Sequence, residues 1–174
     1  MSVMRTTVLS LIATCSLLAG MGAGCERSDA KAAPTTAPMA GTPTPVPSAV
    51  TTSYKIQIKP VGTYKKGQAG VFEILLETKG EYHVNEDYPT KFKASEGPGV
   101  TYAKDKLERA KDADAFTFTK CASGKDNCTL SLKVSFTPTQ TGSVKVGGTV
   151  NFGVCTAATC LIEKQTLELS ATVS

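Results

Sequence analysis

Apolar and polar side chains alternate at every second position through most of the chain after Ser53, and this pattern constrains the fold more than any other feature. In the first such stretch, Tyr54, Ile56 and Ile58 alternate with lysine and glutamine. Because neighbouring side chains of a strand point to opposite faces, this alternation predicts a strand with one buried face. Further strands are predicted over residues 69–78, 81–84, 91–94, 100–103, 115–119, 130–136, 144–154 and 167–173.

Glycine and proline separate these short stretches, as is typical of turns. They stand at Gly67, Gly80, Gly97, Pro98, Gly99, Pro138 and Gly142. Many short strands at this spacing predict an all-β protein, an immunoglobulin-like antiparallel β-sandwich of about 120 residues. Within it, Gly147 and Gly148 predict a β-bulge. Residues 104–113 predict either one or two helical turns or a charged loop.

Residues 1–24 predict an export signal. One basic residue, Arg5, precedes a short apolar run over residues 8–20, and small residues continue from there to Cys25. A basic start, a short apolar core and a small-residue end are typical of a secretory signal. The run is shorter than the about 20 apolar residues that a spanning helix needs. The alternative is a buried N-terminal helix.

The residues Gly22-Ala23-Gly24-Cys25 resemble the signal of bacterial lipoproteins. That resemblance implies that Cys25 is lipidated and becomes the new N-terminus, although the family usually has leucine where Gly22 stands. Lipidation would hold the protein at a bacterial membrane, on its periplasmic or cell-surface side, without spanning it. Ordinary cleavage after Ala32 is the alternative, and Cys15 is expected to leave with the signal in either case.

Residues 25–52 predict a flexible tether between this anchor and a domain over residues 53–174. The stretch is rich in alanine, threonine and proline and has almost no large apolar side chain. Such a composition does not bury enough apolar surface to offset the entropy lost on ordering. A disordered leader with no mechanical role is the alternative.

Charge and composition exclude several classes of function. The 19 basic and 15 acidic residues are interleaved along the chain, without the basic stripe that is typical of nucleic-acid binding. A blue-copper site needs two histidines, a cysteine and usually a methionine, whereas the chain has one histidine and all four methionines precede the predicted domain. We therefore expect no metal and no cofactor, and no serine, carboxylate or phosphate-loop enzyme.

Four cysteines fall in the predicted domain as two close pairs. Cys121 and Cys128 are separated by six residues, and Cys155 and Cys160 by four. In an exported protein such cysteines predict disulfides, and of the three possible connectivities local pairing is the simplest. A four-cysteine zinc site is the alternative, although its usual spacings are absent.

The local pairings would be weak constraints on the chain. Rings this small stabilise by only about 2.2 to 2.5 kcal/mol in the loop-closure model. The domain already has enough apolar residues for a core, so weak bridges slightly favour a chemical role for one pair. Many secreted hairpins nevertheless carry local bridges that only brace a turn.

One segment resembles a known redox family. Residues 151–169 (NFGVCTAATCLIEKQTLEL) resemble the cysteine-pair segment of the periplasmic N-terminal domain of DsbD, the transmembrane thiol:disulfide interchange reductase. Residues 80–85 (GEYHVN), followed by Pro89, are similar to an aromatic-His-Val-Asn…Pro stretch of related domains. The resemblance covers roughly residues 54–173, and the fold that it implies is the same immunoglobulin-like sandwich.

The resemblance implies an electron relay. Cys155 and Cys160 would be the redox pair, which accepts electrons from a membrane donor and passes them to periplasmic thioredoxin-like proteins. Cys121 and Cys128 are extra to the family; they fall near the loop that covers its active site, and we expect a structural disulfide there. His83 would sit near the pair as a base, or else be an ordinary packed or surface residue.

Departures from the family keep a second interpretation open. Residues 161–163 (LIE) stand where the family often has proline, and no membrane or thioredoxin domain follows in this chain. Protein-disulfide reductase activity is therefore one expectation. The alternative is a non-catalytic structural or protein-binding lipoprotein whose two disulfides only brace loops.

Overall fold

The computed structural model describes residues 45–124 and 126–174, which form an all-β domain. The predicted signal, Cys25 and most of the predicted tether lie outside these residues. The strands are β1 (Ser48–Val50), β2 (Tyr54–Val61), β3 (Gly70–Thr78), β4 (His83–Val84), β5 (Lys91–Ala94), β6 (Val100–Tyr102), β7 (Lys106–Glu108), β8 (Phe116–Lys120), β9 (Asn127–Pro138), β10 (Gly142–Cys155) and β11 (Cys160–Val173), with one short 3₁₀ turn, η1 (Ala113–Ala115). None of the described residues forms a helix long and apolar enough to cross a membrane.

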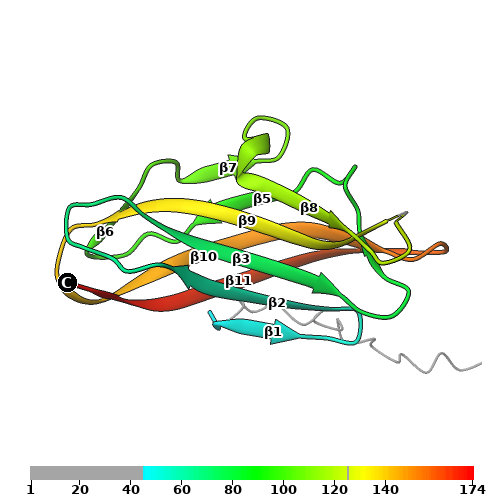
Figure 1. Ribbon diagram of the computed structural model, residues 1–174, viewed down its shortest axis with the longest axis horizontal. Helices are drawn as coiled ribbons and strands as arrows, with labels where there is room; N and C mark the ends of the chain where they lie inside the picture. The colour runs from blue at the N-terminus through cyan, green and yellow to red at the C-terminus, as the bar shows by residue number, and fades with distance from the viewer. Residues whose placement is uncertain (1–44, 125) are drawn as a thin grey trace, which may run out of the picture. The chain divides into compact units, whose positions relative to one another are not determined.

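The strands form two layers (Figure 1). One layer is built on β2, β3 and β9, with β1 beside β2 and with β6 and β8 beside β9. The other is built on β10, with β11 on one side and β5 and β7 on the other. The short strand β4 pairs with both β9 and β10 and so joins the layers at one end. All these pairings are antiparallel, and the predicted immunoglobulin-like antiparallel sandwich is confirmed.

The core lies between the layers and consists of the apolar residues that alternate along each strand. Phe72 of β3 and Phe92 of β5 meet from opposite layers, with ring centroids 6.2 Å apart. Tyr54 of β2 and Phe152 of β10 are fully buried and pack edge to face at 5.1 Å. Each such side chain contributes roughly 1.5–3 kcal/mol when it leaves water. The two layers are therefore held together mainly by hydrophobic packing.

Two elements differ from the sequence prediction. Strand β1 pairs with β2, and Val46 forms a bridge with Leu167, so the last residues of the predicted tether belong to the domain and the boundary at residue 53 is wrong. Part of the stretch expected to be helical or a charged loop is strand β7. Both strands have three residues, and so short a stretch shows no clear alternation in the sequence.

The predicted bulge at Gly147 and Gly148 is also wrong. Strand β10 pairs with β11 without a break in register through both glycines. Glycine is needed here because neighbouring backbone comes close: a Cβ on Gly147 would lie 2.0 Å from the Leu167 carbonyl oxygen, and one on Gly148 would lie 2.3 Å from that of Lys93. Gly147 also has a φ of 152°, which side chains of L residues rarely adopt.

We predict that Gly147→Ala lowers the free energy of unfolding by about 3 kcal/mol or more, because it adds backbone strain to a steric clash. Chemical denaturation of the two proteins measures this difference. Gly97→Ala is the matched control: a Cβ there meets nothing closer than 3.9 Å, so its effect should stay within about 0.5 kcal/mol. Equal effects of the two substitutions would contradict the steric explanation.

Candidate functional site

The Cys155–Cys160 disulfide closes the tip of the β10–β11 hairpin. The two residues are the last pair in the strand register, and their Cα atoms lie 4.0 Å apart. Between them the chain turns over four residues, where Thr156 N–H donates to the Thr159 carbonyl at 2.8 Å. The Thr156 hydroxyl accepts hydrogen bonds from the backbone N–H groups of Ala158 and Thr159, each at 3.2 Å. The predicted local pairing is thus confirmed.

The two sulfur-bearing residues differ sharply in exposure. Cys155 is only 4% exposed, whereas Cys160 is exposed to solvent. The difference follows from their neighbours, since Cys155 lies on a central strand between β11 and β4 and Cys160 begins β11 beside the turn. A protein that approaches this disulfide from outside therefore meets Cys160 first.

His83 lies directly opposite Cys155 on the neighbouring strand β4. Directly opposed residues of antiparallel strands have side chains on the same face, with Cβ atoms about 4.5–5.5 Å apart. His83, Cys155 and Cys160 therefore form one row across three strands, on the outer face of the layer. His83 and the two cysteines are far apart in the sequence, and only the resemblance to the N-terminal domain of DsbD suggested that they lie close together.

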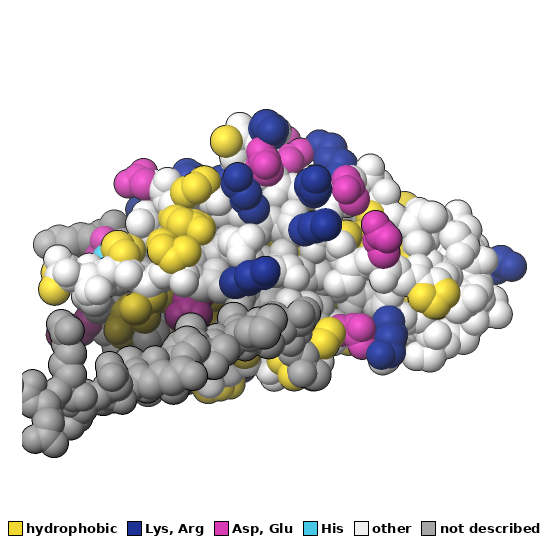
Figure 2. All heavy atoms as spheres, turned by 180° about the vertical axis from the view of Figure 1, so that it is seen from behind, with side chains coloured by type: hydrophobic (Ala, Val, Ile, Leu, Met, Phe, Trp, Pro, Cys, Tyr) yellow, Lys and Arg dark blue, Asp and Glu magenta, His cyan; other side chains and the backbone are white. Residues whose placement is uncertain are grey.

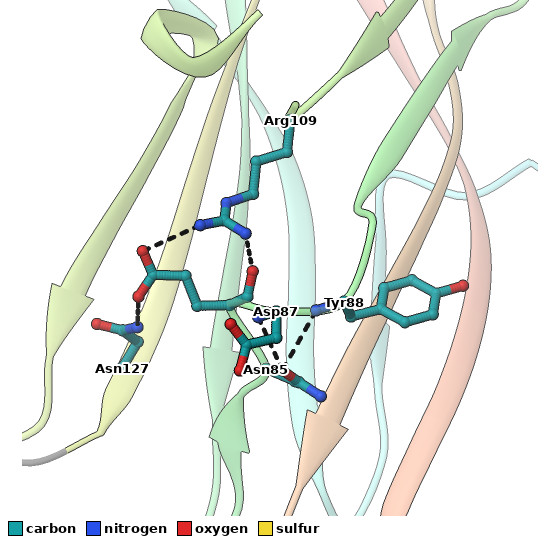
Figure 3. A network of polar contacts seen from close by, with 6 residues as sticks. Asn85, Asp87, Tyr88, Arg109 and Asn127 are labelled. Carbon is teal, nitrogen blue, oxygen red and sulfur yellow. Dashed lines mark hydrogen bonds and ion pairs between the residues drawn. The ribbon is translucent and has the colours of Figure 1, made fainter. Parts of the chain in front are cut away.

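The loop that follows β4 packs against the strand carrying Cys155 (Figure 3). Its first residue, Asn85, donates its backbone N–H to the Gly153 carbonyl at 2.9 Å. The Asn85 side-chain oxygen accepts the backbone N–H groups of Asp87 at 2.9 Å and Tyr88 at 3.3 Å, which fixes a tight turn. A Cβ on Gly153 would lie 3.1 Å from Tyr88 side-chain atoms, so Tyr88 packs closely over Gly153.

Glu86 ties the same loop to two other strands. The Arg109 guanidinium, just after β7, donates to the Glu86 backbone carbonyl and to its Oε1, the latter at 3.2 Å. Asn127 Nδ2, at the start of β9, donates to the other carboxylate oxygen at 2.8 Å. Dashed lines in Figure 3 mark these hydrogen bonds from Arg109 and Asn127. Arg109 also lies over the Phe118 ring, 5.1 Å from its centroid.

The second disulfide, Cys121–Cys128, lies next to this network. It spans the turn between β8 and β9, with Cα atoms 4.8 Å apart. Cys121 N–H donates to the Asp126 carbonyl at 2.7 Å, and the Thr78 hydroxyl donates to the Cys128 carbonyl at 3.1 Å. Since Asn127 adjoins Cys128, this bridge braces the residue that holds Glu86.

His83 also lines a polar hollow of about 230 Å³ at this end of the domain. Its charged lining residues are Glu86, Asp87, Lys120 and Asp126. Within residues 45–124 and 126–174, no group of three or more His, Cys, Asp or Glu side chains is arranged to hold a metal ion. The four cysteines of the domain are in disulfides, so a four-cysteine zinc site is not present.

A buried tyrosine anchors β11 close to the hairpin tip. Tyr54 of β2 donates its hydroxyl to Glu163 Oε2 at 3.1 Å and accepts a hydrogen bond from Gln165 Nε2 at 2.8 Å. Burial raises the pKa of Tyr54 to about 12, partly opposed by the hydrogen bond from Gln165. The ring also packs on Phe152, which is completely buried.

We predict that Tyr54→Phe lowers the free energy of unfolding by about 1 kcal/mol at pH 7, because two polar side chains of β11 lose their partner. The wild-type protein should lose stability as the pH rises from 10, the ordinary pKa of tyrosine, to about 12, the pKa of Tyr54. Denaturation at several pH values should show a smaller loss over this window in the variant. Identical pH dependence in the two proteins would contradict this assignment.

Comparison with known proteins leaves the family open. No protein-family model matches this sequence, and no curated protein is similar to it at a significant level. Among solved structures, it is similar to the Escherichia coli fimbrial major subunit AggA (12% identity, 72% of this chain and 98% of that chain, TM-score 0.34). Murine CRIg is also similar, with 9% identity over 70% of this chain and 98% of that chain and a TM-score of 0.31. A PapD-like domain of human CEP192 has 11% identity over 78% of this chain and 98% of that chain and a TM-score of 0.28. Likenesses this weak carry no argument about function.

Proposed function

We propose that this domain is a thiol:disulfide exchange module in which Cys155 and Cys160 are the redox pair. The observation that carries the proposal is the unequal exposure of the pair: Cys160 faces solvent, while Cys155 is 4% exposed beside a histidine. Exchange proceeds by attack of a thiolate on one sulfur of a disulfide, so access and leaving-group stabilisation decide the rate. The pair combines an accessible sulfur with a shielded leaving group.

The unequal exposure supports different roles for the two cysteines. A reduced partner's thiolate attacks Cys160 Sγ, the Cys155–Cys160 bond breaks, and its electron pair goes to Cys155 Sγ, which takes up a proton. A second partner thiol then loses its proton and attacks the mixed disulfide. The partner leaves oxidised, and both cysteines of the domain become thiols. In reverse, the same steps pass two electrons and two protons to an oxidised partner.

His83 is the group that we assign to the proton of Cys155. Its position directly opposite Cys155 supports this role, because a neighbouring imidazolium favours the thiolate form of a cysteine. The charged groups that line the hollow with His83 are Glu86 and Asp87 from the loop after β4, Lys120 from β8 and Asp126 before β9.

The partners and location follow from the resemblance to the N-terminal domain of DsbD. We propose that a membrane protein reduces the pair and that periplasmic thioredoxin-like proteins receive its electrons. The two disulfides support an oxidising compartment, where such bonds persist. Lipidation of Cys25 would keep the domain at the membrane, near such a donor.

A purely structural role for both disulfides is the second candidate. It is favoured by the fact that both bridges are local, with sequence separations of 5 and 7 residues, and each closes a turn between neighbouring strands. In this case the protein would be a non-catalytic structural or protein-binding lipoprotein. The reduction potential of the Cys155–Cys160 bond distinguishes the two candidates.

We predict a reduction potential above about −300 mV for Cys155–Cys160, since structural disulfides of secreted proteins usually lie below this value. Equilibration with glutathione or dithiothreitol buffers, followed by mass spectrometry of the alkylated cysteines, measures it. Cys155→Ser should accumulate mixed disulfides through the exposed Cys160, and Cys160→Ser should accumulate few. A lower potential, together with no trapped partner in either variant, would favour the structural role.

We also predict that His83→Gln slows the reaction of the Cys155–Cys160 disulfide with dithiothreitol several-fold near neutral pH, because it removes the group opposite the Cys155 sulfur, which takes up a proton as the bond breaks. Mass spectrometry of the alkylated cysteines over time measures this rate. Equal rates for the wild-type protein and the variant would refute the role of His83.

A further inference from the structure

Four lysines from three strands gather on the outer face of the layer built on β10. They are Lys91 and Lys93 of β5, Lys106 of β7 and Lys164 of β11, here called the lysine face, and all four are exposed. Figure 2 shows this side of the molecule, with a group of dark blue side chains near its centre.

The strand register places these lysines in two neighbouring rows. One row runs Lys164–Asn151–Lys91–Glu108 and the next runs Thr166–Thr149–Lys93–Lys106. Strands in a sheet are about 4.8 Å apart, and residues two apart along a strand differ by about 6.8 Å. Lys91, Lys93 and Lys106 thus lie within about one Debye length of one another at physiological salt, so their fields add, whereas Lys164, about 10 Å from Lys91, is partly screened from them.

The pairing of Lys93 with Lys106 works against the stability of the fold. The two residues are directly opposed on antiparallel strands, where like charges are destabilising. The acidic residue beside them, Glu108, forms an ion pair with Lys91 at 3.8 Å and is shared with Lys111 at 2.8 Å. Among the described residues, no ion pair within 4.0 Å reaches Lys93, Lys106 or Lys164. The lysine face therefore keeps a net positive field.

The lysine face lies on the same side of the layer as the redox pair. Asn151 and Cys155, both on β10, are four residues apart and point to the same face, and each is flanked by β11. Four residues of strand span about 13 Å. A protein interface of ordinary size covers about 800 Å² on each partner, which is large enough to include both the lysine face and Cys160.

We propose that the lysine face is the docking surface for a protein partner with an acidic patch beside its redox cysteine. This inference rests on the proposed function, because the shared face places the partner's sulfur at Cys160 when its acidic patch meets the lysines. Complementary charge mainly speeds encounter and fixes orientation. The lysine face would therefore select which thiol protein reacts with the pair.

A pair of synthetic peptides tests the proposal without a known partner. Each carries one cysteine as a mixed disulfide with thionitrobenzoate, and the two differ only in a nearby run of glutamates or glutamines. Reduced Cys160 attacks the peptide sulfur and releases coloured thionitrobenzoate, and Cys155 then displaces the peptide as a thiol. We expect the acidic peptide to react about tenfold faster at low salt and the difference to disappear as salt is added.

Lysine substitutions test whether the lysine face causes the preference for the acidic peptide. Lys93→Gln combined with Lys106→Gln should reduce the preference for the acidic peptide at least about threefold. This variant should remain folded, since it removes two opposed like charges. Lys66→Gln combined with Lys133→Gln is the matched control, because it removes the same charge from exposed lysines outside the lysine face. An equal loss in both double variants would show an effect of net charge alone and overturn the proposal.

The remaining outcomes separate this proposal from the proposed function. Equal rates for both peptides would refute docking and leave exchange intact, whereas no reaction with either would refute exchange. In the latter case, fluorescence anisotropy of the acidic peptide without cysteine decides whether the lysine face binds it.

Vesicles containing phosphatidylglycerol test whether the lysine face binds a membrane instead. Vesicle binding that depends on Lys93 and Lys106, without any preference for the acidic peptide, would assign the lysine face to a membrane and overturn the proposal.

Discussion

The continuous pairing of β10 with β11 is the constraint on which the rest of this structure depends. It runs without a register shift from Gly142 opposite Val173 to Cys155 opposite Cys160. A slip of one residue would move every side chain to the other face. Phe152 would then leave the core, and Cys155 would enter it. Register here is enforced by the buried face and by the close approach of backbone at Gly147 and Gly148.

This register places the residues that stabilise the fold on the inner face of the layer built on β10 and the candidate functional residues on its outer face. Inward residues of β10 pack against the opposite layer, as Phe152 does with Tyr54. The outward-facing residues of β10 contribute little to the core, so their side chains can serve other functions. The disulfide, the opposed His83 and the lysine face all lie on that outer side. The opposed lysines cost some stability there, which the core can tolerate because it is independent of them.

Much of the fold could be predicted because alternation is a local property of each strand. The predicted strand over residues 91–94 matches β5, and the predictions for residues 69–78 and 144–154 differ from β3 and β10 by one or two residues at an end. Local disulfides also followed from short spacings. The errors have physical causes: β1 and β7 are too short to show alternation, and the two glycines in β10 reflect crowding by neighbouring strands instead of a bulge.

The sequence by itself determined the class of fold, favoured local pairing of the cysteines and, through a resemblance, indicated a candidate redox pair. It left open which sulfur is accessible, because exposure depends on strands that are distant in the chain. Only the tertiary structure buried Cys155 beside β4 and set His83 opposite it. It also brought Lys93 and Lys106 together with Lys164 on one face. Alternation specifies which face a side chain occupies, whereas its neighbours on that face are decided by the register between strands, which depends on the packing of the whole core.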